Sequence, residues 1–488
     1  MEDKKAVETK EETQKQPKQA KMWHAMVVFF VLVVAMGYGI IVFDAGVHIT
    51  MFIGVCMAAI MALILGYKWD FIENAMMDGI HNALQAVIIL IIVGILVGIW
   101  ILAGVVPSMI YYGMQILSPS IFLVAAVLIC SVTSLATGTS WGTMGTMGLA
   151  LVGIAIGLGI PAPVAVGAII SGAYFGDKMS PLSDTTNLAP AMAGTDVFTH
   201  VKFMMLPTGI AYGITLIVFG VLGMQYANTS ADLSAVTEMS EGLLSLFTIN
   251  PLLLLPPVIV IVAVAMKVPA IPGITLGIFA GAIMGVIFQD GITFGEILNA
   301  GMSGYSCDSG VAAIDDLLSS GGIENMMYSV SLTLIAMMFG GIMEKTGLLE
   351  VVVSKIVKIA KKPTSLVVTT EATCLLSNIV MPEQYISVVV PGRMYAETYD
   401  EMDLHPKTLS NALESAGTVT SALIPWNTCG VYIAGVLGVA TLDYLPYAVF
   451  NLLMPIVTIV MAYAGFTLAH KDGTSFRAAK KAAKKVAK

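Results

Sequence analysis

GDKMSPLSDTTNLAPA, residues 176 to 191, is the stretch around which the rest of this sequence is organised. It holds two carboxylates, a lysine, four hydroxyl side chains, an amide and two prolines, and it interrupts sequence that is otherwise apolar. Pro181 lacks a backbone N–H and its ring clashes with the preceding helical turn. We therefore expect the helix that enters this stretch to break near Met179. The break is expected to leave carbonyl oxygens free beside Asp177, Ser183 and Asp184.

The composition indicates an integral membrane protein. Of the 488 residues, 57% are hydrophobic and only 11% are charged, whereas a soluble globular chain carries roughly 25% charged residues. Apolar runs of about 18 to 23 residues recur along the chain, and a helix needs about 20 to cross the bilayer core. Because lipid cannot satisfy unpaired backbone groups, we expect an all-α polytopic membrane protein.

Several functional classes find no support in the sequence. The net charge of -8 is spread over loops and tails, and no nucleic-acid-binding module is present. Neither the GxxxxGK[ST] phosphate loop of ATP-driven pumps nor the HExxH zinc motif occurs. The five cysteines lie mostly in apolar runs and match no metal or disulfide pattern. We expect a protein that is not an enzyme, needs no cofactor and binds no nucleic acid.

The alternation of polar and apolar segments divides the chain into five parts. Residues 1–24 form a polar tail that is too poor in apolar residues to fold alone, and we expect it to be disordered and cytoplasmic. Residues 25–224 and 251–468 are two transmembrane parts, separated by an acidic connector, residues 225–250, that we place outside the cytoplasm. Residues 469–488 form a basic tail.

The two transmembrane parts resemble each other in sequence. At an offset of 243 residues, GIHN at 79–82 matches GIEN at 322–325, and at an offset of 244 Pro181 matches Pro425. Two further pairs of glycines match at the offset of 243, namely Gly98 with Gly341 and Gly104 with Gly347. We therefore predict an internal repeat, each copy with about five transmembrane helices, a re-entrant hairpin and a proline-broken helix.

The positions of the basic residues predict how the two repeats are oriented in the membrane. Lys68 follows the second apolar segment of the first repeat, whereas the equivalent loop, residues 289–325, is acidic and has no basic residue. Residues 111–120 carry no charge, whereas the equivalent second-half loop contains four lysines between 355 and 362. By the positive-inside rule, the repeats have inverted topology and both termini are cytoplasmic. Inverted repeats are typical of secondary transporters.

Each broken helix is preceded by a segment that is too polar for a simple span. Residues 131–148 place TGTS between two apolar runs, and residues 375–390 place a proline, a glutamate and a glutamine likewise. Irregular backbone at membrane depth is tolerated where it lines protein or water, so each segment is a candidate hairpin whose tip lines a site. Two topologies therefore remain open: ten membrane crossings with two re-entrant hairpins, or fourteen full membrane spans.

Acids inside the apolar runs are the candidate functional groups, because a charge at a helix centre costs about 2.5 to 3.5 kcal/mol on insertion scales. Na⁺ is a hard cation that prefers oxygen ligands. We expect its ligands to be Asp184, at the centre of the site, with Ser183, Asp177 and Asn427. The other candidate ion- or substrate-binding residues are Thr137, Thr139, Ser140, Thr185, Asn187, Glu383, Glu414 and Thr428.

Lys178 has two interpretations at this stage. It either neutralises Asp177 in an internal ion pair, which is a structural role, or takes part in transport. For exchange, protonation on one side of the membrane is expected to release Na⁺, and deprotonation on the other side to capture it.

The motif GDKMSPLSDTTNLAPA resembles the NhaC family of Na⁺/H⁺ antiporters, which also contains sodium-linked malate/lactate antiporters. TGTSWGTMG, residues 137–145, and ESAGTVTSALIPWNTCG, residues 414–430, are similar to the same family. The resemblance covers most of the chain except its tails. It implies membership of the wider ion-transporter superfamily, and hence a homodimer in which a moving transport domain holds the hairpins and broken helices.

The sequence leaves more than one interpretation of the transported substrate. Our main expectation is the exchange of Na⁺ for H⁺ across the cytoplasmic membrane by alternating access. The alternative is a sodium- or proton-linked antiporter of a small organic acid, since hydroxyl and amide side chains at the site can also bind a carboxylate. No arginine lies within the core motifs to clamp a dicarboxylate, which favours the cation. A passive ion channel is the third interpretation.

Overall fold

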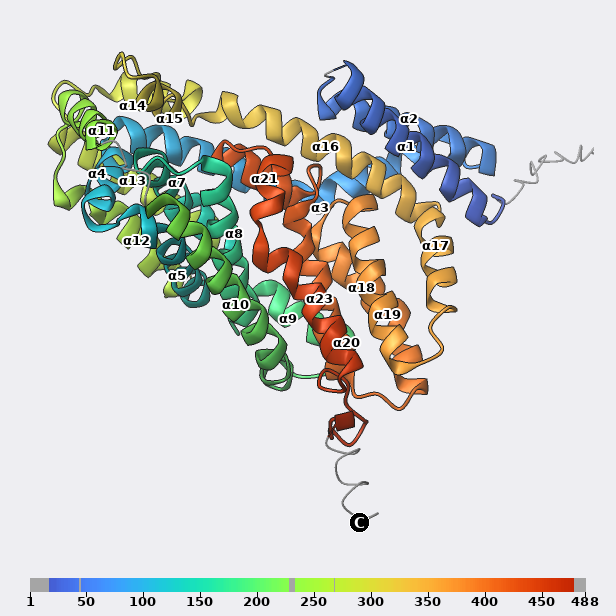
Figure 1. The fold of residues 1–488 in the computed structure, drawn as a ribbon. Helices are drawn as coiled ribbons and strands as arrows, with labels where there is room; N and C mark the ends of the chain where they lie inside the picture. The colour runs from blue at the N-terminus through green and yellow to red at the C-terminus, as the bar shows by residue number, and fades with distance from the viewer. Residues whose placement is uncertain (1–16, 44, 228–232, 267, 478–488) are drawn as a thin grey trace, which may run out of the picture.

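The computed structural model of the chain describes residues 17–43, 45–227, 233–266 and 268–477. These residues fold as a bundle of helices (Figure 1), as the apolar runs predict. Three sequence-based predictions fall wholly or partly outside the described residues: those for the start of the polar tail, for part of the connector and for the end of the basic tail.

The described helices are those of a multi-pass membrane protein. Eight of them are long and apolar enough to cross a membrane, and ten spans result if each of two bent helix pairs counts as one. The bends are 96° between residues 237–246 and 251–263, and 92° between residues 428–437 and 441–447. The predicted all-α polytopic fold class is therefore confirmed.

The first half runs from α1 to α10, with η1 as a π-helical turn. Its elements are α1 (Met22–Phe43), α2 (Val47–Leu65), α3 (Trp69–Leu102), α4 (Val105–Ile116), α5 (Pro119–Thr137), α6 (Ser140–Thr143), η1 (Met144–Gly148), α7 (Leu149–Gly157), α8 (Ala162–Met179), α9 (Asp184–Ala193) and α10 (Val197–Ala227). Gly66 ends α2 and Gly138 ends α5 at φ values of 95° and 71°. Glycine adopts this left-handed conformation without the steric penalty of a Cβ.

The connector contains one helix, α11 (Leu233–Leu246), and the second half follows it. Its elements are η2 (Pro251–Leu254), α12 (Leu255–Ala265), α13 (Ala270–Phe288), α14 (Phe294–Ser303), α15 (Ala312–Leu318), α16 (Ile323–Lys345), α17 (Leu348–Val357), α18 (Pro363–Val380), α19 (Gln384–Glu401), α20 (Pro406–Ala412), η3 (Leu413–Thr418), η4 (Val419–Leu423), α21 (Thr428–Leu437), α22 (Thr441–Tyr444), η5 (Leu445–Tyr447) and α23 (Val449–Tyr463).

Helix boundaries recur at a constant spacing in the two halves. Helices α5, α6, α8, α9 and α10 begin at residues 119, 140, 162, 184 and 197. Helices α18, α19, α20, α21 and α22 begin at 363, 384, 406, 428 and 441, which is 244 residues later in each case. This is the offset at which Pro181 matches Pro425, so similar local sequence produces the same succession of elements twice.

The long helices α3 and α16 pack closely at glycines. A Cβ on Gly79 would meet the carbonyl oxygen of Met337 and lie 3.0 Å from Gly341 Cα. A Cβ on Gly98 would lie 3.2 Å from Gly322 N. Because Gly322 is the sequence match of Gly79 and Gly341 that of Gly98, each contact is the counterpart of the other.

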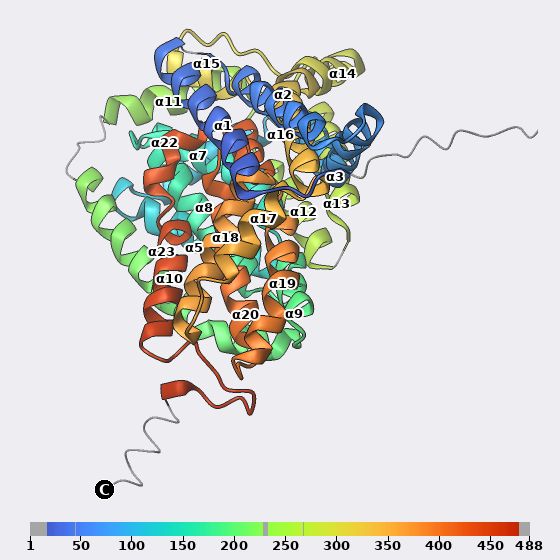
Figure 2. The ribbon, with the colours of Figure 1, turned by 90° about the vertical axis from the view of Figure 1, so that its right-hand side faces the viewer.

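Helices of each half also pack against helices of the other half. Helices α1 and α2 contact α17 and α16, while η2 and α13 contact α4 and α3. Figures 1 and 2 both show α1 and α2 beside α16 at one edge of the bundle. Further along the chain, α9 packs on α19, and α21 packs on η1 and α7. The two halves are interlocked, and the two broken helices lie against both of them.

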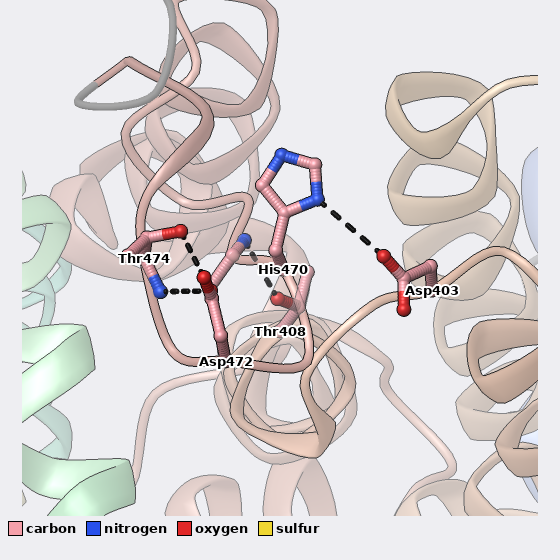
Figure 3. A network of polar contacts seen from close by, with 6 residues as sticks. Asp403, Thr408, His470, Asp472 and Thr474 are labelled. Carbon is pink, nitrogen blue, oxygen red and sulfur yellow. Dashed lines mark hydrogen bonds and ion pairs between the residues drawn. The ribbon is translucent and has the colours of Figure 1, made fainter. Parts of the chain in front are cut away.

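The chain after α23 folds back onto the loop between α19 and α20 and onto the start of α20. The backbone N–H of Ala469 donates to Thr408 Oγ1 (3.2 Å). Figure 3 shows the turn that follows, in which His470 Nδ1 faces Asp403 Oδ2 (3.8 Å) and the carboxylate of Asp472 accepts two hydrogen bonds (2.8 and 2.6 Å). The described start of the basic tail is therefore anchored on this end of the bundle.

Candidate ion- and substrate-binding site

The first broken helix lies where Pro181 predicts it. Residues 180–183 separate α8 from α9. Ser183 caps α9, since its Oγ accepts a hydrogen bond from the backbone N–H of Thr186 (3.4 Å). The cap satisfies one of the N–H groups that a helix start leaves without a partner.

Side chains of α9 bind the carbonyl oxygens that the break exposes. Thr186 Oγ1 donates to the carbonyl oxygens of Asp177 and Lys178 (3.1 Å each). Asn187 Nδ2 donates to two carbonyl oxygens within the break (2.9 and 2.6 Å). These carbonyls are thus not free, contrary to the sequence-based expectation, because the polar residues of α9 fold back onto them. The carbonyl oxygens of Asp177 and Ser183 also accept a second hydrogen bond each, from the backbone N–H groups of Ser180 and Asn187 (3.1 Å each).

The second broken helix repeats the arrangement. Pro425 lies in the gap between η4 and α21. Asn427 caps α21, since its Oδ1 accepts a hydrogen bond from the backbone N–H of Cys429 (3.1 Å). Asn427 and Ser183 are therefore caps at equivalent positions of the two halves.

The first hairpin tip is formed by Gly138 and Thr139, between α5 and α6. Thr139 caps α6 by accepting a hydrogen bond from Gly142 N (3.2 Å). A Cβ on Gly138 would lie 2.8 Å from the carbonyl carbon of Leu182. This tip therefore packs directly on the first helix break.

The second hairpin tip joins α18 to α19 in the same way. Glu383 caps α19, because its Oε2 accepts a hydrogen bond from Ile386 N (3.0 Å). The tip contacts the second break, since Thr428 N donates to the carbonyl oxygen of Pro382 (2.9 Å). Trp426 Nε1 also donates to the carbonyl oxygen of Ile379 (2.7 Å). Each half therefore pairs one hairpin tip with one broken helix.

A cavity of about 530 Å³ lies at the first of these pairs. Its wall combines the first hairpin tip, the first helix break, one face of α3, the chain leading into α13 and the start of α19. The second break does not contribute to the lining. Eight of the candidate residues line the cavity, namely Thr137, Thr139, Ser140, Asp177, Ser183, Asp184, Thr185 and Glu383.

Asp177 is held in the cavity wall by Ser140. The backbone N–H and the Oγ of Ser140 both donate to Asp177 Oδ2, at 3.1 and 2.6 Å. Asp177 is only 5% exposed, and hydrogen bonds to a charged acceptor are stronger than neutral ones. The hairpin tip therefore fixes this carboxylate, whereas Asp184 is exposed at the cavity.

Lys178 does not pair with its neighbour Asp177. Its Nζ donates to Ser415 Oγ (3.3 Å), and its side chain is fully buried. The ion pairs within 4.0 Å found in the described part of the chain do not involve Lys178. The internal ion pair considered from the sequence is therefore wrong for this structure, because successive helical residues point in different directions.

Four other candidate residues lie outside the cavity lining. Glu414 is buried and accepts a hydrogen bond from Thr185 Oγ1 (3.2 Å). Asn427 Nδ2 donates to the backbone and side-chain oxygens of Asn378 (3.2 and 3.1 Å). Asn187 and Thr428 contact backbone carbonyls as described above. The structure thus does not bring these four side chains together with Asp184 in one cavity.

The sequence did not point to several residues that line the cavity. Asn82 and Gln85 contribute from α3, and Gln384 and Tyr385 contribute from the start of α19. Two of them carried a signal in the sequence: Asn82 belongs to the repeated GIHN motif, and Gln384 to the second candidate hairpin. Among the described residues, the charged side chains of the lining are Asp177, Asp184 and Glu383, and none of them is basic.

The chain matches the sequence profiles of two protein families. A sequence profile of the Na⁺/H⁺ antiporter family matches residues 172–466, and a profile of the C4-dicarboxylate anaerobic carriers matches residues 1–226. The malate-2H⁺/Na⁺-lactate antiporter of Bacillus subtilis is 40% identical over 437 residues, which cover 90% of this chain and 93% of that protein.

Two further relatives are of similar length. The Na⁺/H⁺ antiporter NhaC of Alkalihalophilus pseudofirmus is 36% identical, with 87% of this chain and 93% of that protein covered. The arginine/ornithine antiporter ArcD of Halobacterium salinarum is 38% identical, with 85% and 86% covered. On the extent of these matches, this chain belongs to the Na⁺/H⁺ antiporter family.

Proposed function

We propose that this protein exchanges Na⁺ for H⁺ across the cell membrane by alternating access, with the cavity at the first helix break as its cation site. The observation that carries the proposal is the charge of the cavity. Three carboxylates, Asp177, Asp184 and Glu383, line it without a basic residue among the described lining. Such a wall attracts a cation and repels an isolated anion.

The proposed ligands are oxygen atoms of the hairpin tip and the break. Asp177 and Asp184 supply carboxylates, and Ser140 and Ser183 supply hydroxyl oxygens at the same wall. Hard cations favour such oxygen sets. Asn427 lies away from this wall, so we propose that it supports the second hairpin through Asn378 and does not bind Na⁺ directly.

Exchange requires that the binding of Na⁺ and the binding of H⁺ to the protein oppose each other. When the protein binds a proton on one side of the membrane, it loses Na⁺, and when it loses the proton on the other side, it binds Na⁺ again. The two pairs of hairpin tip and broken helix are the elements proposed to move. We also propose that the protein is a homodimer, that it lies in the lipid bilayer of the cell membrane, and that both of its termini are cytoplasmic.

An organic cargo is the second candidate, and the size of the cavity favours it. A volume of about 530 Å³ far exceeds what one Na⁺ needs and is in the range of small-molecule sites. The relatives named for malate and lactate or for arginine and ornithine make a small carboxylate or amino acid the cargo to test. A bound Na⁺ at Asp177 and Asp184 would then offset the negative charge of an organic acid.

The proposal is tested with Asp184→Asn in everted membrane vesicles. This change removes one charge from the cavity and keeps the shape of the side chain. We expect Na⁺-dependent proton movement to be lost while the amount of protein in the membrane is unchanged. Asp443→Asn, at an exposed position on α22, is the matched control and should behave like the wild type. Wild-type exchange in Asp184→Asn would refute the site.

A further inference from the structure

A second polar cluster lies beside the broken helix α8 but outside the cavity lining. It consists of Lys178 on α8, Glu371 on α18 and Glu414 on η3. Their side chains are 0%, 3% and 0% exposed, and the cavity lining includes none of the three. An ion in the cavity therefore does not touch these groups.

Of the four carboxylate oxygens of this cluster, only Glu414 Oε1 has a hydrogen-bond partner in the described part of the chain, namely Thr185 Oγ1. Both Oε1 and Oε2 of Glu371, and Oε2 of Glu414, are buried without a partner in the described part of the chain. A buried ionised carboxylate without donors is costly, and the cost falls when the group binds a proton. Glu371 is thus a group whose surroundings suit the protonated form.

The charges of the cluster do not balance when all three groups are ionised. The charge of Lys178 acts on both Glu371 and Glu414, so two negative charges face one positive charge. One bound proton makes the cluster neutral. The other titratable groups near Glu371 are Cys374 of its own helix and Tyr399 of α19. Around the rest of the cluster, the charge of Asp177 acts on Glu414, and His200 of α10 lies within reach of the charge of Lys178.

We propose that Glu371 is the proton-binding site of the exchange, separate from the cation site, and that Lys178 is its fixed counter-charge. The inference rests on the proposed function. On deprotonation, the O–H bond of the Glu371 carboxylic acid breaks, the proton passes to water on the open side, and the carboxylate left behind is stabilised by Lys178.

Contacts in the structure link this cluster to the cavity. Thr185 lines the cavity, and its Oγ1 lies 3.1 Å from Ser183 Oγ and donates to Glu414 Oε1 at 3.2 Å. Lys178 directly follows Asp177, and Thr186 Oγ1 bridges the carbonyl oxygens of both (3.1 Å each). A cation bound at Asp177 adds positive charge near the cluster and so favours loss of its proton.

The test measures Na⁺ binding and proton release separately, on the purified full-length protein in weakly buffered detergent solution. NaCl is added, with choline chloride as the salt control, and released protons are read with a pH indicator dye. Bound ²²Na⁺ is measured in parallel. Glu371→Gln mimics the protonated side chain and leaves Glu414 as the carboxylate whose charge acts on Lys178. Glu397→Gln, at an exposed position on α19, is the matched control.

We expect Glu371→Gln to bind Na⁺ and to release at least fivefold fewer protons per bound Na⁺ than the wild type or Glu397→Gln. Equal proton release would overturn the inference. Glu414→Gln gives a second reading, because Glu371 is then held ionised by Lys178, and proton release should fall as well; unchanged release in this variant would also overturn it. If the wild type itself releases no protons on binding Na⁺, the proposed function fails instead.

Discussion

Ser140 and Asp177 form the contact that joins the first hairpin to the first broken helix: one oxygen of the carboxylate accepts both the backbone N–H and the hydroxyl of the serine, at 3.1 and 2.6 Å. The serine is the first residue of α6, and the aspartate lies in the last turn of α8. The position of this carboxylate in the cavity therefore depends on the position of the hairpin tip.

Ser140→Ala should weaken Na⁺ binding without unfolding the protein. The change removes the hydroxyl donor to Asp177 and keeps the backbone donor. A hydrogen bond to a charged group contributes about 1.5 to 3 kcal/mol, so the apparent Na⁺ affinity in proteoliposomes is expected to fall by about tenfold or more. Ser118→Ala, at an exposed position before α5, is the control. An unchanged affinity in Ser140→Ala would show that this contact does not support the site.

Gly138→Ala should impair transport more than Gly159→Ala. Both glycines have positive φ, 71° and 72°, so alanine is similarly strained at both positions, by about 1 kcal/mol. Only at Gly138 does a new Cβ meet the first helix break, 2.8 Å from Leu182, whereas nothing lies within 4 Å at Gly159. Initial exchange rates in proteoliposomes should fall for Gly138→Ala alone. Equal rates in the two variants would argue against close packing of tip and break.

Gly341→Ala should destabilise the protein through the contact between α3 and α16. Its Cβ would meet the carbonyl oxygen of Ala75, and overpacking of this kind costs about 1 to 3 kcal/mol. Gly213→Ala, on α10 with open space around it, is the control. We expect a lower unfolding temperature in detergent for Gly341→Ala alone. A wild-type unfolding temperature would contradict the reciprocal glycine packing.

Ser118→Cys and Lys362→Cys should be labelled from opposite sides of the membrane. These positions are 244 residues apart, before α5 and before α18. Inverted repeats place the first outside and the second in the cytoplasm. In a variant without the five native cysteines, a membrane-impermeant maleimide applied to intact cells should label only Ser118→Cys. Labelling of both positions from the same side would refute the inverted topology.

The breaks were predictable because they follow from local chemistry. Pro181 and Pro425 each remove a backbone donor from a helix, and the structure places a gap at both. The apolar runs and the repeat offset likewise predicted the helical class and the succession of elements. These signals act within a few residues of the chain, so they can be read without knowing the packing.

The set of residues that line the cavity was less predictable, because it depends on how the helices rotate and pack. Asn427 was expected beside Na⁺, yet the second hairpin holds it against Asn378. Lys178 was considered for an ion pair with Asp177, yet the turn of α8 directs it toward Ser415. Gln85 joins the lining only because α3 crosses near the first hairpin tip.

The central claim is that the cavity exchanges Na⁺ for H⁺, and proton flux into proteoliposomes tests it most directly. The purified protein is reconstituted, a Na⁺ gradient is imposed, and internal pH is followed with the gradient alone and with added malate, lactate, arginine or ornithine. We predict proton flux with the Na⁺ gradient alone, unchanged by the organic compounds. Flux that appears only when an organic compound is present would contradict this account and assign the cavity to that compound.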